Sequence, residues 1–197
     1  MNNHYNGKNM KNTVKTKDPD FELVHGIVQG DERAFEQLMQ KYEQAVFNTI
    51  YRYTGVRDDV EDLAQEIFVK VWKNAKKFKG KSKFSTWLYR ITVNHCLDYR
   101  SRHKQTPVSL DQIVDKGKVP ESLQISEDYD QKRKVALVRK ALSELPERQR
   151  IALVLAQYEG LSYKEIADAM KISVSSVESL IFRARRTLRT RLTELMK

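Results

Sequence analysis

Cysteine, proline and long apolar runs are all scarce in this chain of 197 residues. Cys96 is the only cysteine, so an internal disulfide is impossible and nothing points to an oxidising compartment. No apolar run approaches the roughly 18 residues that a membrane-spanning helix needs. The Asn- and Lys-rich first 17 residues lack an apolar core, so we expect a disordered tail rather than a secretory signal. These absences predict a cytoplasmic protein with no direct membrane insertion.

Recognisable catalytic and cofactor motifs are also missing. The four histidines are scattered, without cysteines or carboxylates at metal-ligand spacing: His4, His25, His95 and His103. Neither a G-x-x-x-x-G-K-[ST] loop nor a G-x-G-x-x-G turn occurs. Cys96 follows His95 directly, and adjacent helical residues diverge by about 100°, so they form a poor nucleophile and base pair. The sequence therefore predicts no enzyme, no metal and no cofactor, with Cys96 as a small packing residue.

Positive charge is abundant and unevenly placed. The net charge is +10, and residues 31–66 hold nine acids and four bases. Residues 69–104 instead hold eleven bases and one acid, Asp98. A basic surface of this density attracts phosphates and binds them in a salt-dependent way. The pattern favours nucleic-acid binding, although solvated lysines on a helix would give the same charge run.

Apolar residues repeat at helical spacing, and no strand pattern is clear. Four helices are predicted before residue 103: one capped by Asp20, one running from Asp31 to Gly55, one starting at Asp58 or Asp59, and one capped by Ser85. Residues 103–130 contain Pro107, Gly117 and Pro120 and are acidic, which is typical of a mobile linker. We therefore expect that the domains on either side are not rigidly docked.

The C-terminal part contains a helix-turn-helix pattern. Ser162 and Glu165 form an S-x-x-E capping box that opens a short helix ending at Met170. Ser173 can cap a long final helix, whose predicted core stripe is Val174, Val177, Ile181, Ala184 and Leu188. The polar face holds Ser175, Ser176, Glu178, Ser179, Phe182, Arg183 and Arg186. Serines near the N-terminus, an exposed aromatic and later arginines favour a helix in a DNA major groove over a helical hairpin with one stray aromatic.

Two earlier helices carry candidate sites. On the third, Asp62, Gln65 and Glu66 point away from the apolar stripe, and composition alone would leave them as a solvated face. A basic loop precedes the fourth helix, and aromatic and polar side chains lie along that helix. The candidate residues of the loop and the helix are Phe78, Lys79, Lys81, Lys83, Phe84, Trp87, Arg90 and Asn94. Aromatics beside a positive groove suit unstacked single-stranded bases. Trp87 can equally be a core residue.

Four segments, taken in order, resemble the extracytoplasmic-function (ECF) group of the sigma-70 family. Residues 62–72 are similar to the D-L-x-Q-E-x-F-x-x-x-W signature of region 2.2, and residues 84–94 to the F-x-T-W-L-Y-R-I-A-x-N signature of regions 2.3 and 2.4. Residues 145–150 with 161–167, and residues 181–185, resemble region 4. Regions 1.1, 1.2 and 3 have no counterpart, which is the pattern of this group.

The resemblance implies an all-α fold with two small helical domains: a region 2 four-helix domain at 20–102 and a region 4 helix-turn-helix domain at 131–197. A disordered tail (1–19) and a flexible linker (103–130) would complete the chain. The implied function is promoter recognition and DNA melting with the RNA polymerase core, and an anti-sigma factor is a further implied partner.

The resemblance also implies roles for the candidate residues. Asp62, Gln65 and Glu66 would bind the polymerase core. Residues 78–84 with Trp87, Arg90 and Asn94 would bind the −10 element, and the polar face of the last helix the −35 element. Glu178 and Leu180 stand where relatives often carry Arg or Lys, which implies an atypical −35 sequence. A helix-turn-helix repressor or activator and a nucleic-acid enzyme are the alternatives, and the signature at 62–72 disfavours both.

Overall fold

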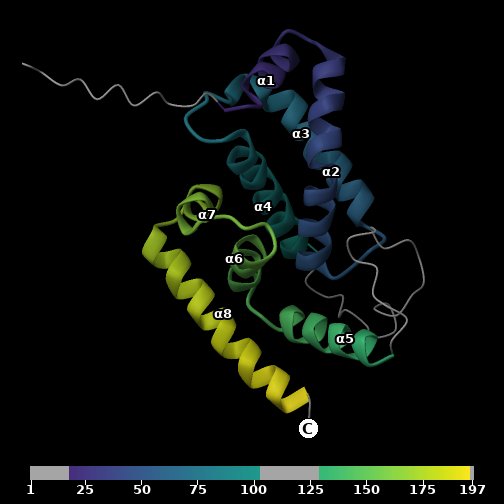
Figure 1. The fold of residues 1–197 in the computed structure, drawn as a ribbon, viewed down its shortest axis with the longest axis vertical. Helices are drawn as coiled ribbons and strands as arrows, with labels where there is room; N and C mark the ends of the chain where they lie inside the picture. Colours follow the sequence, from purple (N-terminus) through teal and green to yellow (C-terminus); the bar gives the residue numbers. More distant parts are fainter. Residues whose placement is uncertain (1–17, 103–128, 196–197) are drawn as a thin grey trace, which may run out of the picture.

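The computed structural model describes residues 18–102 and 129–195, with side chains in the second range described from residue 133. These residues form helices and turns without a strand. The N-terminal unit (18–102) holds α1 (Phe21–Val28), α2 (Glu32–Thr54), α3 (Val60–Asn74), the short 3-10 helix η1 (Ala75–Lys77) and α4 (Phe84–Arg102). The C-terminal unit (129–195) holds α5 (Tyr129–Ser143), α6 (Glu147–Gln157), α7 (Tyr163–Met170) and α8 (Val174–Leu195) (Figure 1). The all-α prediction is confirmed; the linker lies almost wholly outside the described residues.

Local side-chain caps are present where α2, α7 and α8 begin, whereas α1, α3, η1 and α6 begin without one. Asp31 accepts hydrogen bonds from the amides of Arg33 and Ala34, at 2.9 and 3.2 Å, and Gly55 ends α2 in the left-handed conformation. The predicted capping box at α7 is present, since Ser162 accepts from the Glu165 amide and Glu165 accepts from the Ser162 amide. Ser173 likewise accepts from the Ser176 amide at the start of α8.

Two predicted caps are wrong. Ser85 lies inside α4, whose first amide, that of Phe84, instead donates to the carboxylate of Asp18, 66 residues earlier in the sequence. Asp20 makes no side-chain cap and is buried, where it accepts from Lys41 and Tyr42. Both carboxylates find long-range partners, which a local rule cannot anticipate. They tie the start of the described chain to α2 and α4.

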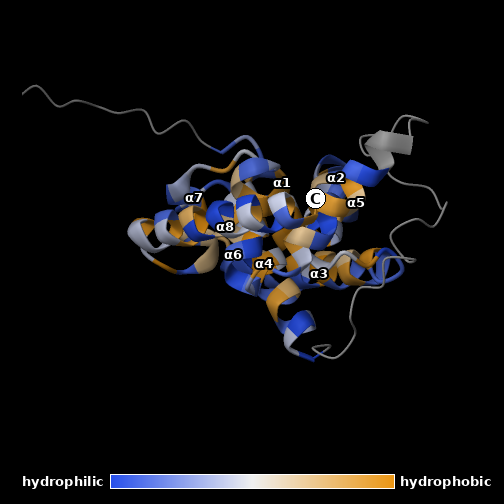
Figure 2. Ribbon diagram, turned by 90° about the horizontal axis from the view of Figure 1, so that it is seen from below, coloured by the Kyte–Doolittle hydropathy of each residue, from blue (hydrophilic) through white to orange (hydrophobic). Residues whose placement is uncertain are grey.

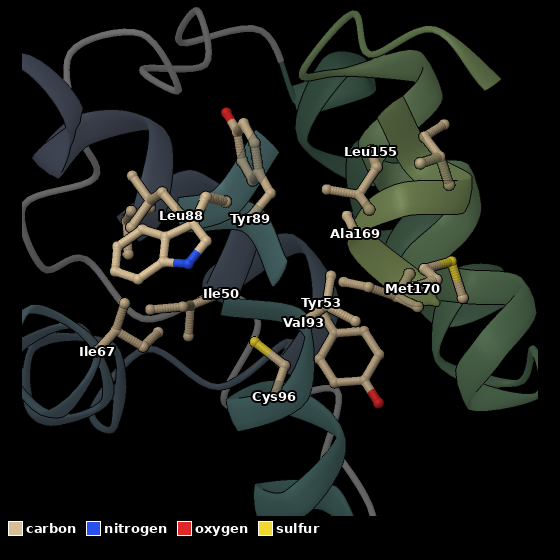
Figure 3. Close-up of a cluster of buried hydrophobic side chains, with 14 of the residues drawn as sticks. Ile50, Tyr53, Ile67, Leu88, Tyr89, Val93, Cys96, Leu155, Ala169 and Met170 are labelled. Atoms are coloured by element: carbon tan, nitrogen blue, oxygen red, sulfur yellow. The ribbon is translucent and has the colours of Figure 1, made fainter. Parts of the chain in front are cut away.

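Buried apolar side chains from the two units form one continuous core. Hydrophobic and hydrophilic residues are interspersed along the helices, as Figure 2 shows, and α6 is buried on all sides from Arg150 to Leu155. In Figure 3, Leu155, Ala169 and Met170 of the C-terminal unit lie beside Tyr53, Tyr89 and Val93 of the N-terminal unit. The expectation that the two parts are not rigidly docked is therefore not matched by the structure. Complementary side chains on α2, α4, α6 and α7 create a packed interface that linker composition does not report.

Candidate nucleic-acid and partner-binding faces

The polar face of α8 is exposed as predicted. All seven of its candidate residues are exposed: Ser175, Ser176, Glu178, Ser179, Phe182, Arg183 and Arg186. Phe182 keeps 67% of its surface exposed, while Val177, Ile181 and Ala184 are buried on the opposite side. Val174 was predicted in the core stripe, but it is 42% exposed because it starts the helix, at the edge of the packed surface.

Sequence analysis missed one residue of this face. A groove of about 350 Å³ is lined by Ser175, Ser176, Ser179, Leu180 and Arg183 of α8, by Ile172, and by Arg148 near the start of α6. Arg148 is exposed and adds a second guanidinium group to the groove, next to that of Arg183 in the lining. Its place in the chain, 27 residues before Ser175, gave no local signal of this proximity. The groove offers hydroxyl, apolar and guanidinium contacts together, as base-edge and phosphate contacts require.

The outer edge of α3 is acidic and borders an apolar groove. Asp62, Gln65 and Glu66 are exposed, and Val69 beside them keeps 48% of its surface exposed. A groove of about 460 Å³ follows between α2 and α3, lined by Phe35, Met39, Glu43, Phe47, Glu61, Ala64, Gln65, Phe68 and Val69. Carboxylates next to exposed apolar side chains are typical of a protein-binding surface.

The aromatic residues at the start of α4 are not the exposed platform that the sequence suggested. Phe84 is fully buried and Phe78 and Trp87 are nearly so. Their three rings contact one another with centroids 5.7–5.8 Å apart, in the core between α1, α2 and α4. The core interpretation of Trp87 is thus correct. Stacking of a base on Phe84 would require the N-terminal unit to rearrange.

A basic pocket of about 330 Å³ opens beside this cluster. Its walls are Lys70, Asn74 and Lys77 from α3 and η1, Trp87, Ile91, Asn94 and His95 from α4, and Lys171 from the turn before α8. Lys70, Asn74 and Lys77 were missed as site residues, although their spacing of three and four places them on one helical face. Asn94 is exposed, and burial, followed by the charge of Lys70, lowers the pKa of His95. The pocket thus combines ammonium groups with one exposed amide.

Basic residues of the loop and of α4 divide into two groups. Lys79 and Lys81 are exposed. Lys83 instead donates to Glu165 of α7 at 2.9 Å, and Arg90 donates through Nε to the carbonyl oxygen of Asp168 at 3.1 Å. Gly80 allows the chain to turn in this loop. Its φ of 65° favours glycine, and a Cβ at this position would lie 3.0 Å from the ring of Phe21, so a larger residue would not fit.

Comparison with known proteins identifies the family. Residues 38–106 match Sigma-70 region 2, and residues 136–188 match Sigma-70 region 4. The chain is 33% identical over 189 residues to the RNA polymerase sigma-H factor of Pseudomonas aeruginosa, covering 92% of this chain and 98% of that protein. It belongs to the sigma-70 family, in the ECF group. The chain is an RNA polymerase sigma factor for promoter recognition, as the resemblance predicted.

Further similarities agree with this assignment. The ECF RNA polymerase sigma-E factor of Escherichia coli is 35% identical over 187 residues, covering 89% of this chain and 95% of that protein. A solved structure of CnrH in complex with the cytosolic domain of CnrY has a TM-score of 0.65 at 27% identity, covering 89% of this chain and 97% of that one. The sigma factor RpoE of Bartonella quintana, solved with the anti-sigma factor NepR, shares the fold at 24% identity, with a TM-score of 0.62 and coverage of 81% and 96%.

Proposed function

We propose that the exposed faces of this sigma factor divide promoter recognition between duplex and melted DNA. The observation that carries the proposal is the α8 face, where seven polar or aromatic candidate residues are exposed opposite a buried apolar stripe. In a major groove, Ser175, Ser179 and Phe182 would contact base edges of the −35 element, with Phe182 covering a thymine methyl. Arg183, Arg186 and Arg148 would hold phosphates. Glu178 would repel a nearby phosphate and so restrict how the helix enters the groove.

The N-terminal unit would bind the melted −10 strand. Its pocket brings Lys70, Lys77 and Asn94 together, and the exposed Lys79 and Lys81 extend the positive surface along the preceding loop. Such a surface holds a single strand by its phosphates, and Asn94 offers an amide to a base edge. Lys83, Arg90 and Trp87 would join this surface. Phe78 and Phe84 would serve it by supporting the loop from the core.

The acidic edge of α3 would bind the polymerase core. Asp62, Gln65 and Glu66 would face a basic partner, and the groove with Val69 would take an apolar side chain. An anti-sigma factor is the further partner that the comparisons support, since the solved structure of CnrH contains CnrY and that of RpoE contains NepR.

The remaining assignments follow the family. We place the domain boundaries at 20–102 and 131–197, next to a tail and a linker, consistent with the matched ranges 38–106 and 136–188. The chain would act in the cytoplasm as a transcription initiation factor without catalytic activity of its own. None of the helices that the structure describes is long and apolar enough to cross a bilayer.

The proposal is tested by run-off transcription with purified core polymerase on a genomic promoter library. The full chain should direct initiation at a defined set of promoters. Replacing Asp62 and Glu66 with lysine should abolish both run-off product and co-purification with core, because the charge reversal meets a basic partner. The matched variant E32K/E36K reverses two exposed acids on α2 and should behave as the unmodified chain. Core binding by D62K/E66K at unmodified strength, with unchanged circular dichroism, would refute the core-binding assignment.

A further inference from the structure

His95 lies between the basic pocket and the acidic edge of the N-terminal unit. Helices α3 and α4 pack against each other, and His95 of α4 keeps only 1% of its surface exposed. Its Nδ1 atom is 2.5 Å from the Nζ atom of Lys70, and its Nε2 atom is 3.1 Å from Oε2 of Glu66. Lys70 lines the basic pocket, whereas Glu66 is exposed on the acidic edge of α3. One buried ring thus contacts a residue of each face.

The contact with Lys70 fixes the tautomer of the ring. An ammonium group can only donate a hydrogen bond, so Nδ1 of His95 accepts it and the ring proton lies on Nε2. Burial first, and then the charge of Lys70, lowers the pKa of His95, which keeps the ring neutral at pH 7. A neutral ring is what the contact requires, because an imidazolium ion has no acceptor to offer Lys70.

The other ring nitrogen is only partly satisfied. Nε2 of His95 is buried and has no partner with hydrogen-bond geometry among the described residues, although the Glu66 carboxylate is near. Glu66 keeps 61% of its side chain exposed, so rotation of its carboxylate can align an oxygen with the Nε2 proton. Packing alone does not explain a histidine here, because an apolar side chain of similar size would avoid the cost of the buried polar atom.

The hydrogen bond to His95 restricts a flexible side chain of the pocket. A lysine side chain samples many rotamers, and it loses this freedom when its ammonium group binds a phosphate. Because His95 already holds Lys70, part of that entropy is lost before a strand arrives. The ammonium group has three donors, so two remain for phosphate oxygens. Asn94, the residue before His95, is exposed at the same pocket.

We infer that His95 is a positioning residue for the −10 strand, whose Nδ1 atom holds the Lys70 ammonium group ready for a strand phosphate beside the base that Asn94 contacts. The inference rests on the proposed assignment of the basic pocket to the −10 strand. His95 is buried, so it does not touch the strand, and its effect passes through Lys70. Loss of the contact should weaken strand binding about fivefold, which is the typical net effect of one hydrogen bond.

Two substitutions at His95 separate positioning from packing. Asparagine places its amide oxygen near the position of Nδ1 and can accept from Lys70, whereas glutamine reaches the position of Nε2 and leaves Lys70 without an acceptor. Binding is measured by fluorescence anisotropy, with preformed holoenzyme titrated into a single-stranded −10 oligonucleotide. His95→Asn should bind within about twofold of the unmodified protein, and His95→Gln about fivefold more weakly. A packing role predicts the reverse order, because asparagine is the poorer helix former.

A matched control makes the same chemical change away from the pocket. His25 of α1 is exposed, so His25→Gln should leave strand binding unchanged. The contact itself is measured without any substitution at Lys70 or His95, by imidazole ¹⁵N NMR of the free chain at pH 7. The ring proton of His95 should lie on Nε2. A proton on Nδ1 would overturn the inference, since Lys70 could not then donate to that atom.

A double-mutant cycle tests whether the effect passes through Lys70. Lys70→Met should weaken strand binding, and adding His95→Gln to it should have no further effect. Full additivity, or equal binding by His95→Asn and His95→Gln, would overturn the positioning role while leaving the pocket assignment intact. If Lys70→Met and Asn94→Ala both bind the strand as the unmodified protein does, the pocket is not the −10 site. The proposed function of the pocket then fails together with the inference.

Discussion

The two DNA-reading faces of this sigma factor differ in how the fold presents them. On α8 the residues that would contact bases are exposed on the outer side of a helix, with only an apolar stripe packed behind them. On α4, two of the proposed contacts, Lys83 and Arg90, already hydrogen-bond α7 of the same chain. A duplex can be read by a preformed helix face, whereas a melted strand exists only after binding has begun. The covered face is the one needed later.

Removing the buried arginine should have the largest effect on this arrangement. Arg150→Met leaves the carbonyl oxygens of Tyr53 and Leu145 without their donor in a buried site. We expect a loss of about 3 kcal/mol in the free energy of unfolding, and a fall in Tm of roughly 6–12 °C. Calorimetry measures this fall in Tm. Arg148→Met, two residues away and exposed, is the control and should change Tm by less than about 2 °C. An equally stable Arg150→Met variant would show that the two units do not depend on this contact.

Phe182→Ala should separate the two faces functionally. The side chain is exposed, so the free energy of unfolding should change by less than about 0.5 kcal/mol. Binding of the −35 duplex by holoenzyme should weaken by about 1–3 kcal/mol if the ring covers a thymine methyl. Duplexes with thymine replaced by uracil supply the matched control, because the variant and the unmodified protein should bind these with similar affinity. Loss of selectivity at the −10 element in this variant would contradict the division of duplex and single-strand reading between α8 and α4.

Lysines of the loop should have a smaller, salt-dependent effect. Lys81→Ala removes one exposed cation beside the pocket. If it contacts a phosphate of the single strand, the slope of log K against log salt should become shallower by about 0.7. Titration of holoenzyme with a single-stranded −10 oligonucleotide at several salt concentrations measures the slope. Lys164→Ala on α7, also exposed, serves as the control and should leave the slope unchanged.

The smallest expected effect is on the acid titration of Glu165. Its hydrogen bonds with Lys83 and then Ser162 lower its pKa to about 2 from the usual 4.5. A depressed carboxyl pKa means that this contribution to stability is present above about pH 4.5 and is lost as the pH falls towards 2. In Lys83→Ala the carbon NMR titration of Glu165 should move towards 4.5. A midpoint that does not move would show that Lys83 does not hold the carboxylate in solution.

Sequence reasoning worked where a feature depends on nearby residues. The capping box at Ser162 and Glu165, the Asp31 cap and the polar face of α8 all follow from spacing within a few turns of helix. It failed where partners are distant along the chain. Asp18 caps α4, and Glu159 joins the C-terminal unit to α2 and α4. Neither contact has a local pattern.

The aromatic residues show a related limit. The same sequence of Phe78, Phe84 and Trp87 suits a stacking platform or a core cluster, since both need large apolar rings close together. Only the packing of α1 and α2 against them decides for the core. Similarly, Lys70 and Lys77 belong to the pocket because α3 lies beside α4, which the charge count of residues 69–104 could not specify.

The division between duplex and single-strand reading is tested most directly with holoenzyme on two templates that share one sequence. One template is fully duplex, and the other is pre-melted at the −10 element. On the duplex, Phe182→Ala and Asn94→Ala should both lower open-complex formation. On the pre-melted template, Asn94→Ala should stay impaired. The variant still lacks the side-chain amide that would contact the melted strand. Phe182→Ala should approach the unmodified rate, because strand capture no longer depends on prior −35 binding. Equal rescue of the two variants by pre-melting would contradict the account.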